Sequence, residues 1–314
     1  MLLSGILDYS GSVTPLVLLI IALVINIYTG KLALFSTHKG HPVNSLERLI
    51  DWFDLKLNRD NRSPIDRAIR GCLTTISILL LSGIFGLGVT WLSHSLPLAW
   101  IFELVLLLIT LDQSNTYKKV SKINTALSNH DIETARQRVI GLTLESVDQM
   151  DAFSIARTAI EVLATSLVKH LLAPVFYYAL FGFLGLAIYH AITTLNIKIG
   201  QKTNRYRYFG ITASCINTTI LFFPGLLAGC LIVLASLLVP SANPVKSYKN
   251  IFKYGNKFYS SHLGIALSAF AGAFDLALAG PRKFSHKRKN EPWIGAGTAK
   301  ATHQDIHRSL HLYA

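Results

Sequence analysis

The distribution of charge along the chain constrains its fold more than any other feature. All 30 Lys and Arg side chains lie outside four long stretches, which are 13–29, 72–111, 170–193 and 211–245, and Glu103 is the only acidic residue inside them. A charge in hydrocarbon is costly, and a helix needs about 20 apolar residues to span a bilayer. The pattern therefore predicts an all-α, polytopic helical membrane protein.

The apolar stretches divide into five predicted spans. The predicted spans are residues 13–29, 72–94, 97–111, 170–193 and 211–239. Proline 224 is expected to kink or tilt the last of them. Segment 263–279 contains Asp275 and many small residues, so it is compatible with a span or with a helix packed inside the bundle.

The polar segments predict amphipathic helices on the cytoplasmic side. Apolar residues recur at helical spacing within 44–57. Residues 112–169 form the largest polar insert, in which a turn ending at Asp131 predicts a helix over 132–140 and a second helix follows from about 148 to 169. We expect one membrane-embedded domain over residues 1–314, located in the cell inner membrane.

The net charge of +13 allows three interpretations. Basic residues collect in cytoplasmic loops of membrane proteins, basic loops attract anionic lipid, and a polyanionic substrate would also favour them. Nucleic acid is not expected as a partner. Eight basic residues in 31–70 and none in 1–14 favour an external N-terminus, but alternation of the spans then puts the basic loop 194–210 outside. Either 170–193 is re-entrant or function outweighs topology in that loop.

Short motifs identify no chemistry by themselves. The sequence has no G-x-x-x-x-G-K-[ST], G-x-S-x-G or H-E-x-x-H. The three cysteines lie in apolar runs without a C-x-x-C pair, which is typical of buried hydrophobic residues. His303, His307 and His311 share a helix face that could bind a metal, although a solvated helix is the favoured interpretation. A transporter is disfavoured because Glu103 is the only charge within a predicted span.

Several blocks of residues occur in a distinctive order. The blocks are His41-Pro42-Val43, Ala173-Pro174-Val175-Phe176-Tyr177, Arg205-Tyr206-Arg207-Tyr208-Phe209-Gly210, Ala271-Gly272-Ala273, Gly280-Pro281, Pro292-Trp293-Ile294-Gly295 and Asp305-Ile306. Together they resemble the CobD/CbiB family of cobalamin-biosynthesis membrane proteins, and the resemblance covers about 30–313.

The resemblance implies an enzyme of cobalamin assembly. Such a protein would join adenosylcobyric acid to aminopropanol or its phosphate, forming an amide with ATP and Mg²⁺ and without a bound prosthetic group. Its expected partners are the corrinoid precursor, the small amine, the lipid bilayer and other membrane enzymes of corrinoid assembly.

The resemblance also implies site residues. Glu161, Asn196 and His41 are the candidate catalytic residues, and the candidates for binding substrate or phosphate are Lys202, Arg205, Arg207 and Asp305. A solvated helix face is the alternative for Glu161. Interfacial anchoring beside Tyr206 and Tyr208 is the alternative for the two arginines.

The chain departs from the family pattern at several acidic positions. Thr165, Ser166, Lys169 and His170 stand where the family usually has Glu-Asn and then Asp-Gly before its Ala-Pro, and further departures fall at Asn196, Asn217 and Leu226. The chain is therefore either a divergent active synthase or a relative without ligase activity, similar to the AmpE membrane modulators. The C-terminal Gly-Pro and Pro-Trp-Ile-Gly blocks favour the synthase.

Overall fold

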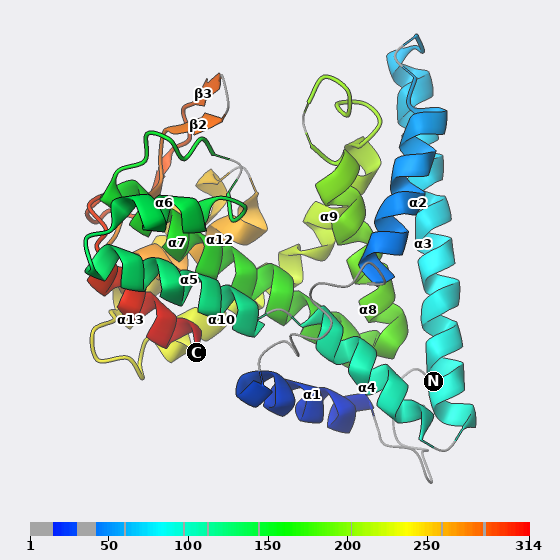
Figure 1. The fold of residues 1–314 in the computed structure, drawn as a ribbon, viewed down its shortest axis with the longest axis horizontal. Helices are drawn as coiled ribbons and strands as arrows, with labels where there is room; N and C mark the ends of the chain where they lie inside the picture. Colours follow the sequence, from blue (N-terminus) through cyan, green and yellow to red (C-terminus); the bar gives the residue numbers. More distant parts are fainter. Residues whose placement is uncertain are drawn as a thin grey trace. The chain divides into compact units, whose positions relative to one another are not determined.

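The computed structural model describes residues 15–29, 42–59, 61–96, 98–111, 113–143, 145–201, 203–258, 260–284 and 287–314. Within them nearly all regular structure is helical, and four strands of two or three residues form two antiparallel pairs (Figure 1). This composition confirms the prediction of an all-α membrane protein. The chain divides by its internal contacts into two compact units, Met1–Leu111 with Ala173–Ile220 and Asp112–Leu172 with Leu221–Ala314. The prediction of a single domain stays a prediction.

The first unit contains six helices among the described residues. They are α1 (Pro15–Thr29), α2 (Pro42–Leu57), α3 (Pro64–Ser95), α4 (Ala99–Thr110), α8 (Ala173–Ile199) and α9 (Ile211–Ile220). The long helix α3 begins where Ser63 accepts a hydrogen bond from the Asp66 amide at 3.2 Å and Pro64 occupies the first turn. Helix α8 is interrupted at Gly182, which has φ 61°.

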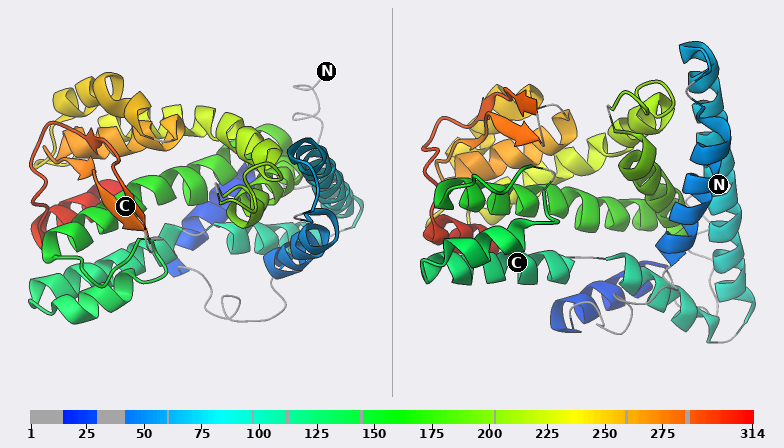
Figure 2. Two further views of the ribbon diagram at one scale, coloured as in Figure 1. Left: turned by 90° about the horizontal axis from the view of Figure 1, so that it is seen from above. Right: turned by 45° about the horizontal axis from the view of Figure 1, so that its top comes forward.

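Two hydrophobic clusters hold the first unit together. In one, Leu18, Leu107 and Tyr178 join α1, α4 and α8. In the other, Ile50 from α2 packs with Phe209 of the loop before α9 and with buried residues of α3, α8 and α9. Figure 2 shows α2 running beside α3. The amphipathic helix predicted over 44–57 is thus packed on one face.

The second unit is built around helix α12. Its helices are α5 (Gln113–Ser128), α6 (Ile132–Val139), α7 (Ala152–Ser166), the π-helix η2 (Leu167–Leu172), α10 (Phe222–Ala235), α11 (Pro244–Tyr254), the 3₁₀-helix η3 (Gly255–Lys257), α12 (Ser261–Ala273) and α13 (His303–Tyr313). The described side chains of α12 are all buried, and the helix packs against α7, α10 and α11. Segment 263–279 therefore contains most of the buried 13-residue helix α12 followed by a strand.

The strands of the second unit follow α12. Strand β1 (Leu278–Ala279) pairs with β4 (Trp293–Ile294), and β2 (Arg282–Phe284) pairs with β3 (Lys287–Lys289). Helices α5 and α13 lie side by side in both figures (Figures 1 and 2).

Three helical stretches among the described residues are long and apolar enough to cross a membrane. They are Pro64–Ser95, Ala152–Ile199 and Ile211–Ala235, and Pro15–Asn26 and His262–Ala273 are shorter apolar helices. Three predicted spans, 72–94, 170–193 and 211–239, coincide with the long stretches. The last is divided at Leu221 into α9 and α10. Pro224 therefore lies in the first turn of α10, where the backbone N–H groups have no partner within the helix, so that the missing N–H of proline costs no hydrogen bond.

Candidate functional site

Glu161 lies in the middle of α7 and is buried. The helix begins at Asp151, whose side chain accepts a hydrogen bond from the Ser154 amide at 2.8 Å. Ile155, Ile160 and Leu163 are fully buried on the same helix. The Glu161 side chain is only 10% exposed, so the alternative of a solvated helix face is wrong for this residue.

The buried carboxylate of Glu161 belongs to a cluster centred on Arg282. Arg282 donates to Glu145 Oε1 at 2.6 Å through Nη1 and to Glu161 Oε2 through Nη2. Its Nε lies 3.2 Å from Glu291 Oε2. The second oxygen of Glu161 accepts a hydrogen bond from the Ala279 amide at 2.6 Å. Three carboxylates therefore surround one guanidinium in a site that is largely shielded from solvent.

The short β1–β4 pair brings two C-terminal sequence blocks to this cluster. Ala279 faces Trp293 and Leu278 faces Ile294. Gly280 has φ 84°, and a Cβ there would lie 2.7 Å from the Trp293 ring, so glycine is required on both backbone and steric grounds. The Gly280-Pro281 and Pro292-Trp293-Ile294-Gly295 blocks are thus adjacent, and the first leads directly into Arg282.

A polar cavity of about 200 Å³ opens beside the cluster. Glu145, Glu161 and Arg282 line it together with Arg157, Thr158 and neutral polar residues of α7 and the segment before it. Arg157 donates to Ser154 Oγ at 2.9 Å and to the Ala299 carbonyl, and its guanidinium lies over the Trp293 ring with a centroid distance of 5.4 Å. Carboxylates and guanidinium groups therefore share one cavity, which suits a small ligand that has both an amine and an anionic group.

Burial and neighbouring charge alter the titration of the cluster. Burial raises the pKa of Glu145 above its ordinary value of 4.5, against the lowering effect of Arg282. The pKa of Arg282 is raised because the charges of Glu161, Glu145 and Glu291 outweigh its desolvation. Arg282 therefore stays charged, and the cluster holds three carboxylates against one guanidinium.

The raised pKa of Glu145 predicts a pH-dependent stability. The native state binds this proton more tightly than the unfolded state, so the contribution is complete below pH 4.5 and is lost as the pH rises through the folded-state pKa. In Glu145→Gln the melting temperature should fall less than in the wild type between pH 4.5 and 7. Thermal unfolding in detergent across this range measures the effect. A melting temperature that falls as steeply with pH in Glu145→Gln as in the wild type would contradict the prediction.

Among the residues that the structure describes, no three His, Cys, Asp or Glu side chains come together as a metal site. The three carboxylates that converge in the second unit each lie against Arg282. As arranged, the described residues therefore do not fit a Mg²⁺ ion held by the protein alone, which prefers near-octahedral oxygen ligands.

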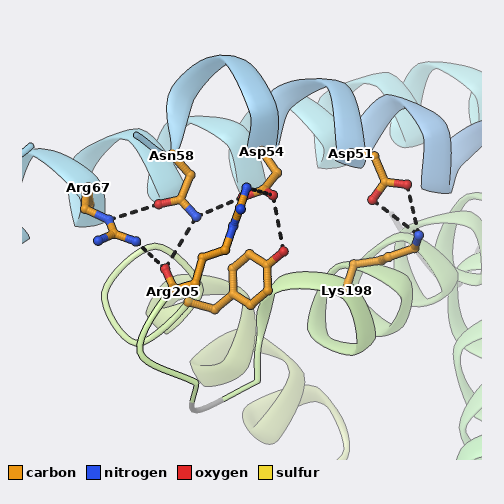
Figure 3. A network of polar contacts seen from close by, with 7 residues as sticks. Asp51, Asp54, Asn58, Arg67, Lys198 and Arg205 are labelled. Atoms are coloured by element: carbon orange, nitrogen blue, oxygen red, sulfur yellow. Dashed lines mark hydrogen bonds and ion pairs between the residues drawn. The ribbon is translucent and has the colours of Figure 1, made fainter. Parts of the chain in front are cut away.

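A second polar network lies in the first unit, between α2, the start of α3 and the loop before α9 (Figure 3). Asp54 accepts hydrogen bonds from Asn58 Nδ2 at 2.8 Å, Arg205 Nη2 at 2.7 Å and Tyr206 Oη at 3.2 Å. Arg67 donates to Asn58 Oδ1 at 2.9 Å and to the Arg205 carbonyl. Arg205 is thereby fixed by both its backbone and its side chain.

The same region shows where the other candidates of the first unit lie. Arg207 lies over the Tyr208 ring with a centroid distance of 5.8 Å and is exposed. Asn196 is half-buried in the last turns of α8, near Lys198, which pairs with Asp51 at 3.0 Å. The structure thus places Arg205, Arg207 and Asn196 in one unit, and Arg205 is engaged by Asp54.

Removing the Asp54 carboxylate should loosen this network. Asp54→Ala leaves three donors without their acceptor in a site where the Asp54 side chain is 9% exposed, which is expected to cost about 1–3 kcal/mol. Asp51→Ala on the same helix is the matched control, because its exposed ion pair with Lys198 is worth about 0–1 kcal/mol. Thermal unfolding in detergent compares them, and equal midpoints for the two variants would refute the assignment.

The remaining candidates have other positions. Asp305 forms a capping box with Thr302 at the start of α13, accepting from the Thr302 amide at 2.8 Å. His41 and Lys202 lie outside the described residues. Glu103 is buried and accepts a hydrogen bond from Tyr178 Oη at 2.7 Å, which gives this carboxylate a partner within the first unit.

Sequence reasoning missed four residues of the cluster and its cavity, namely Glu145, Arg157, Arg282 and Glu291. Two of them could have been found from their neighbours, since Arg282 follows Gly280-Pro281 and Glu291 precedes Pro292. Glu145 and Arg157 lie in the polar insert without a recognisable motif.

Comparison with known proteins gives one consistent result. The family model described as CobD/Cbib protein matches residues 19–313. "Cobalamin biosynthesis protein CobD" from Sinorhizobium sp is 30% identical over 312 residues, covering 96% of this chain and 94% of the relative. The protein of the same name from Brucella melitensis biotype 1 is 30% identical over 301 residues, covering 95% and 92%. That from Halalkalibacterium halodurans is 28% identical over 273 residues, covering 86% and 84%. No solved structure matches.

Proposed function

The chain belongs to the CobD/Cbib protein family, and from this premise we propose that it forms the amide bond between adenosylcobyric acid and aminopropanol or its phosphate. A role in cobalamin biosynthesis follows from the family and from the names of its relatives. The amide ligation, its use of ATP and a multi-pass location in the cell inner membrane are the finer parts of the proposal. Complexes with other membrane enzymes of corrinoid assembly remain a prediction.

The observation that supports this chemistry best is the cavity beside Glu161 and Arg282. A small amino alcohol arrives as an ammonium ion, which carboxylates bind. Glu161 and Glu145 border the cavity, and only one guanidinium, that of Arg282, lies among the three carboxylates of the cluster. Arg157 lines the same cavity and can pair with a phosphate on the amine.

The reaction requires an uncharged amine beside an activated carboxyl carbon. ATP as a co-substrate would supply the phosphoryl group that makes the corrin carboxylate an acylating agent. A glutamate of the cavity accepts the ammonium proton, which leaves the nitrogen lone pair free to attack the carbonyl carbon. The C–N bond forms, the C–O bond to the phosphate breaks, and phosphate leaves with the electron pair and takes up the proton that the amide nitrogen loses. Holding the amine in the cavity contributes through proximity and orientation.

The alternative of an AmpE-like modulator without ligase activity gains no support from these comparisons. The three relatives reported above are named for cobalamin biosynthesis. The cluster also retains Glu161 and the Gly-Pro and Pro-Trp-Ile-Gly blocks around it. The neutral or basic residues at 165, 166, 169 and 170 lie on α7 and η2, so they alter the helix beyond Glu161 and leave the cluster itself intact.

Complementation tests the proposal directly. The chain is expressed in a strain that lacks its own corrin amidation step, and growth that depends on corrinoid synthesis is scored. Membranes from the same cells are incubated with adenosylcobyric acid, aminopropanol phosphate and ATP, and the amide product is detected by mass spectrometry. ATP-dependent product is expected. Membrane-inserted protein that gives neither growth nor product would refute the ligase.

A further inference from the structure

Helix α11 presents a surface that the proposed ligase chemistry does not use. One side of the helix is fixed against α12. Ser247 is fully buried and donates through Oγ to the Ala269 carbonyl at 2.9 Å. A Cβ at Gly272 would lie 2.5 Å from the Lys246 carbonyl oxygen, so the two helices are in backbone contact there. The orientation of α11 about its own axis is therefore determined.

The opposite side of α11 exposes apolar and aromatic side chains in a stripe. Val245, Tyr248 and Phe252 are 60%, 56% and 73% exposed, and their spacing of three and four residues puts them on one face. The rings of Tyr248 and Phe252 contact each other with a centroid distance of 4.9 Å. A packed aromatic pair this open to solvent is unusual on a surface that faces only water.

Lysines border this stripe and acidic residues are missing from the surrounding sequence. Lys249, Lys253 and Lys257 are exposed, and the ammonium groups of Lys253 and Lys257 lie 5.3 and 4.8 Å from the Tyr254 ring. The sequence between Glu161 and Asp275 contains no Asp or Glu. Asp275 itself pairs with Lys246 at 2.9 Å. The face therefore complements a negatively charged surface with an apolar layer beneath it.

The position of α11 in the chain indicates which surface that is. Helix α10 ends the apolar stretch Ile211–Ala235, and Leu237 and Leu238, which follow it, are 66% and 85% exposed. Pro244 begins α11 after a short connection. An apolar stretch able to cross a bilayer thus leads through exposed leucines into a helix with an aromatic and basic face.

We infer that this face, formed by Val245, Tyr248, Lys249, Phe252 and Lys253 of α11 and by Lys257 of the following η3, docks onto the anionic lipid headgroups of the bilayer. The aromatic pair and Val245 enter the region between headgroups and acyl chains, and the lysines contact lipid phosphates. Self-association through this face is disfavoured because it would bring lysines against lysines.

Hydrogen–deuterium exchange of the full chain in nanodiscs tests the inference. Amides of 244–257 should exchange more slowly in phosphatidylcholine with phosphatidylglycerol than in phosphatidylcholine alone. The triple variant Lys249→Gln, Lys253→Gln and Lys257→Gln should lose this difference, with protection reduced by about tenfold or more. Lys246 is left unchanged because of its pair with Asp275. Tyr248→Ser with Phe252→Ser should reduce protection in both lipids.

The matched control removes three lysines of α5 in the same unit, Lys118→Gln, Lys119→Gln and Lys122→Gln, and should leave the exchange of 244–257 unchanged. Protection that is equal with and without phosphatidylglycerol would overturn the anionic part of the inference. Absence of protection in both lipids would overturn the docking itself. If soluble polyphosphate slows the exchange of these amides in phosphatidylcholine nanodiscs as much as phosphatidylglycerol does, this face binds a soluble polyanion and the inference of lipid docking is wrong. None of these outcomes depends on ligase activity.

Discussion

Replacing Glu161 by Gln is expected to abolish growth in the complementation assay and to lower amide formation by at least about 100-fold, the usual contribution of a positioned acid or base. The amide side chain keeps the size of the carboxylate and can still accept the Ala279 N–H. It loses the charge that holds the ammonium and the basicity that accepts its proton. Mass spectrometry of the product over a range of amine concentrations measures both losses.

A control of the same chemistry is available on α6. Glu133 pairs with Arg136 at 2.6 Å on the surface, where its side chain is 66% exposed, so Glu133→Gln should retain wild-type rates. Thermal unfolding of both variants separates activity from folding. If Glu161→Gln forms the amide at the wild-type rate, Glu161 has only a structural role. A lost rate with an unchanged melting temperature would support its direct role.

Replacing Arg282 by Ala should be the most destabilising single change in the second unit. It leaves Glu145, Glu161 and Glu291 buried without their shared cation, and removal of one partner from a buried ion pair costs about 3–5 kcal/mol. The melting midpoint in detergent should fall by roughly 10 °C. The deficit should shrink as the pH is lowered, because buried carboxylates that lack a cation gain stability when protonated.

Two further variants sharpen this result. Arg308→Ala is the control, since Arg308 is 45% exposed and its Nη1 lies 3.8 Å from Asp305, and such surface pairs are worth about 0–1 kcal/mol. The double variant Glu161→Gln with Arg282→Ala should recover part of the lost stability, because the two residues act on each other directly. Two results would contradict the proposed cluster. One is a stability loss in the double variant equal to the sum of the losses in the two single variants, and the other is a melting midpoint for Arg282→Ala equal to that of Arg308→Ala.

Local sequence signals predicted most of the helices. The expected helix over 44–57 lies at 42–57, and the one over 132–140 lies at 132–139 with Asp131 accepting from the Thr134 amide at 3.0 Å. These signals act within one or two turns, through apolar spacing and capping. They do not indicate that 211–239 divides at Leu221 or that α7 continues as a π-helix, because such features depend on packing against the rest of the unit.

The candidate site shows the same limit more clearly. Glu161 was predicted from the family pattern, whereas its partner Arg282 is 121 residues away, and the Gly280-Pro281 block before Arg282 does not indicate which residue it pairs with. Asp54 and Arg205 are likewise separated by 151 residues. Pairs of side chains so far apart in the sequence are brought together by the tertiary arrangement. A single sequence can therefore indicate one member of such a pair without identifying the other.

The link between Glu161 and the β1–β4 pair also sets an order of events during synthesis. When α7 leaves the ribosome, the residues that neutralise and bind its glutamate, Arg282 and the Ala279 amide, have not yet been made. A bare carboxylate resists burial, so the face of α7 around Glu161 has to stay hydrated until the C-terminal strands arrive. The cavity is therefore among the last features of the protein to form, and a ribosome-stalled chain ending before residue 278 would lack it.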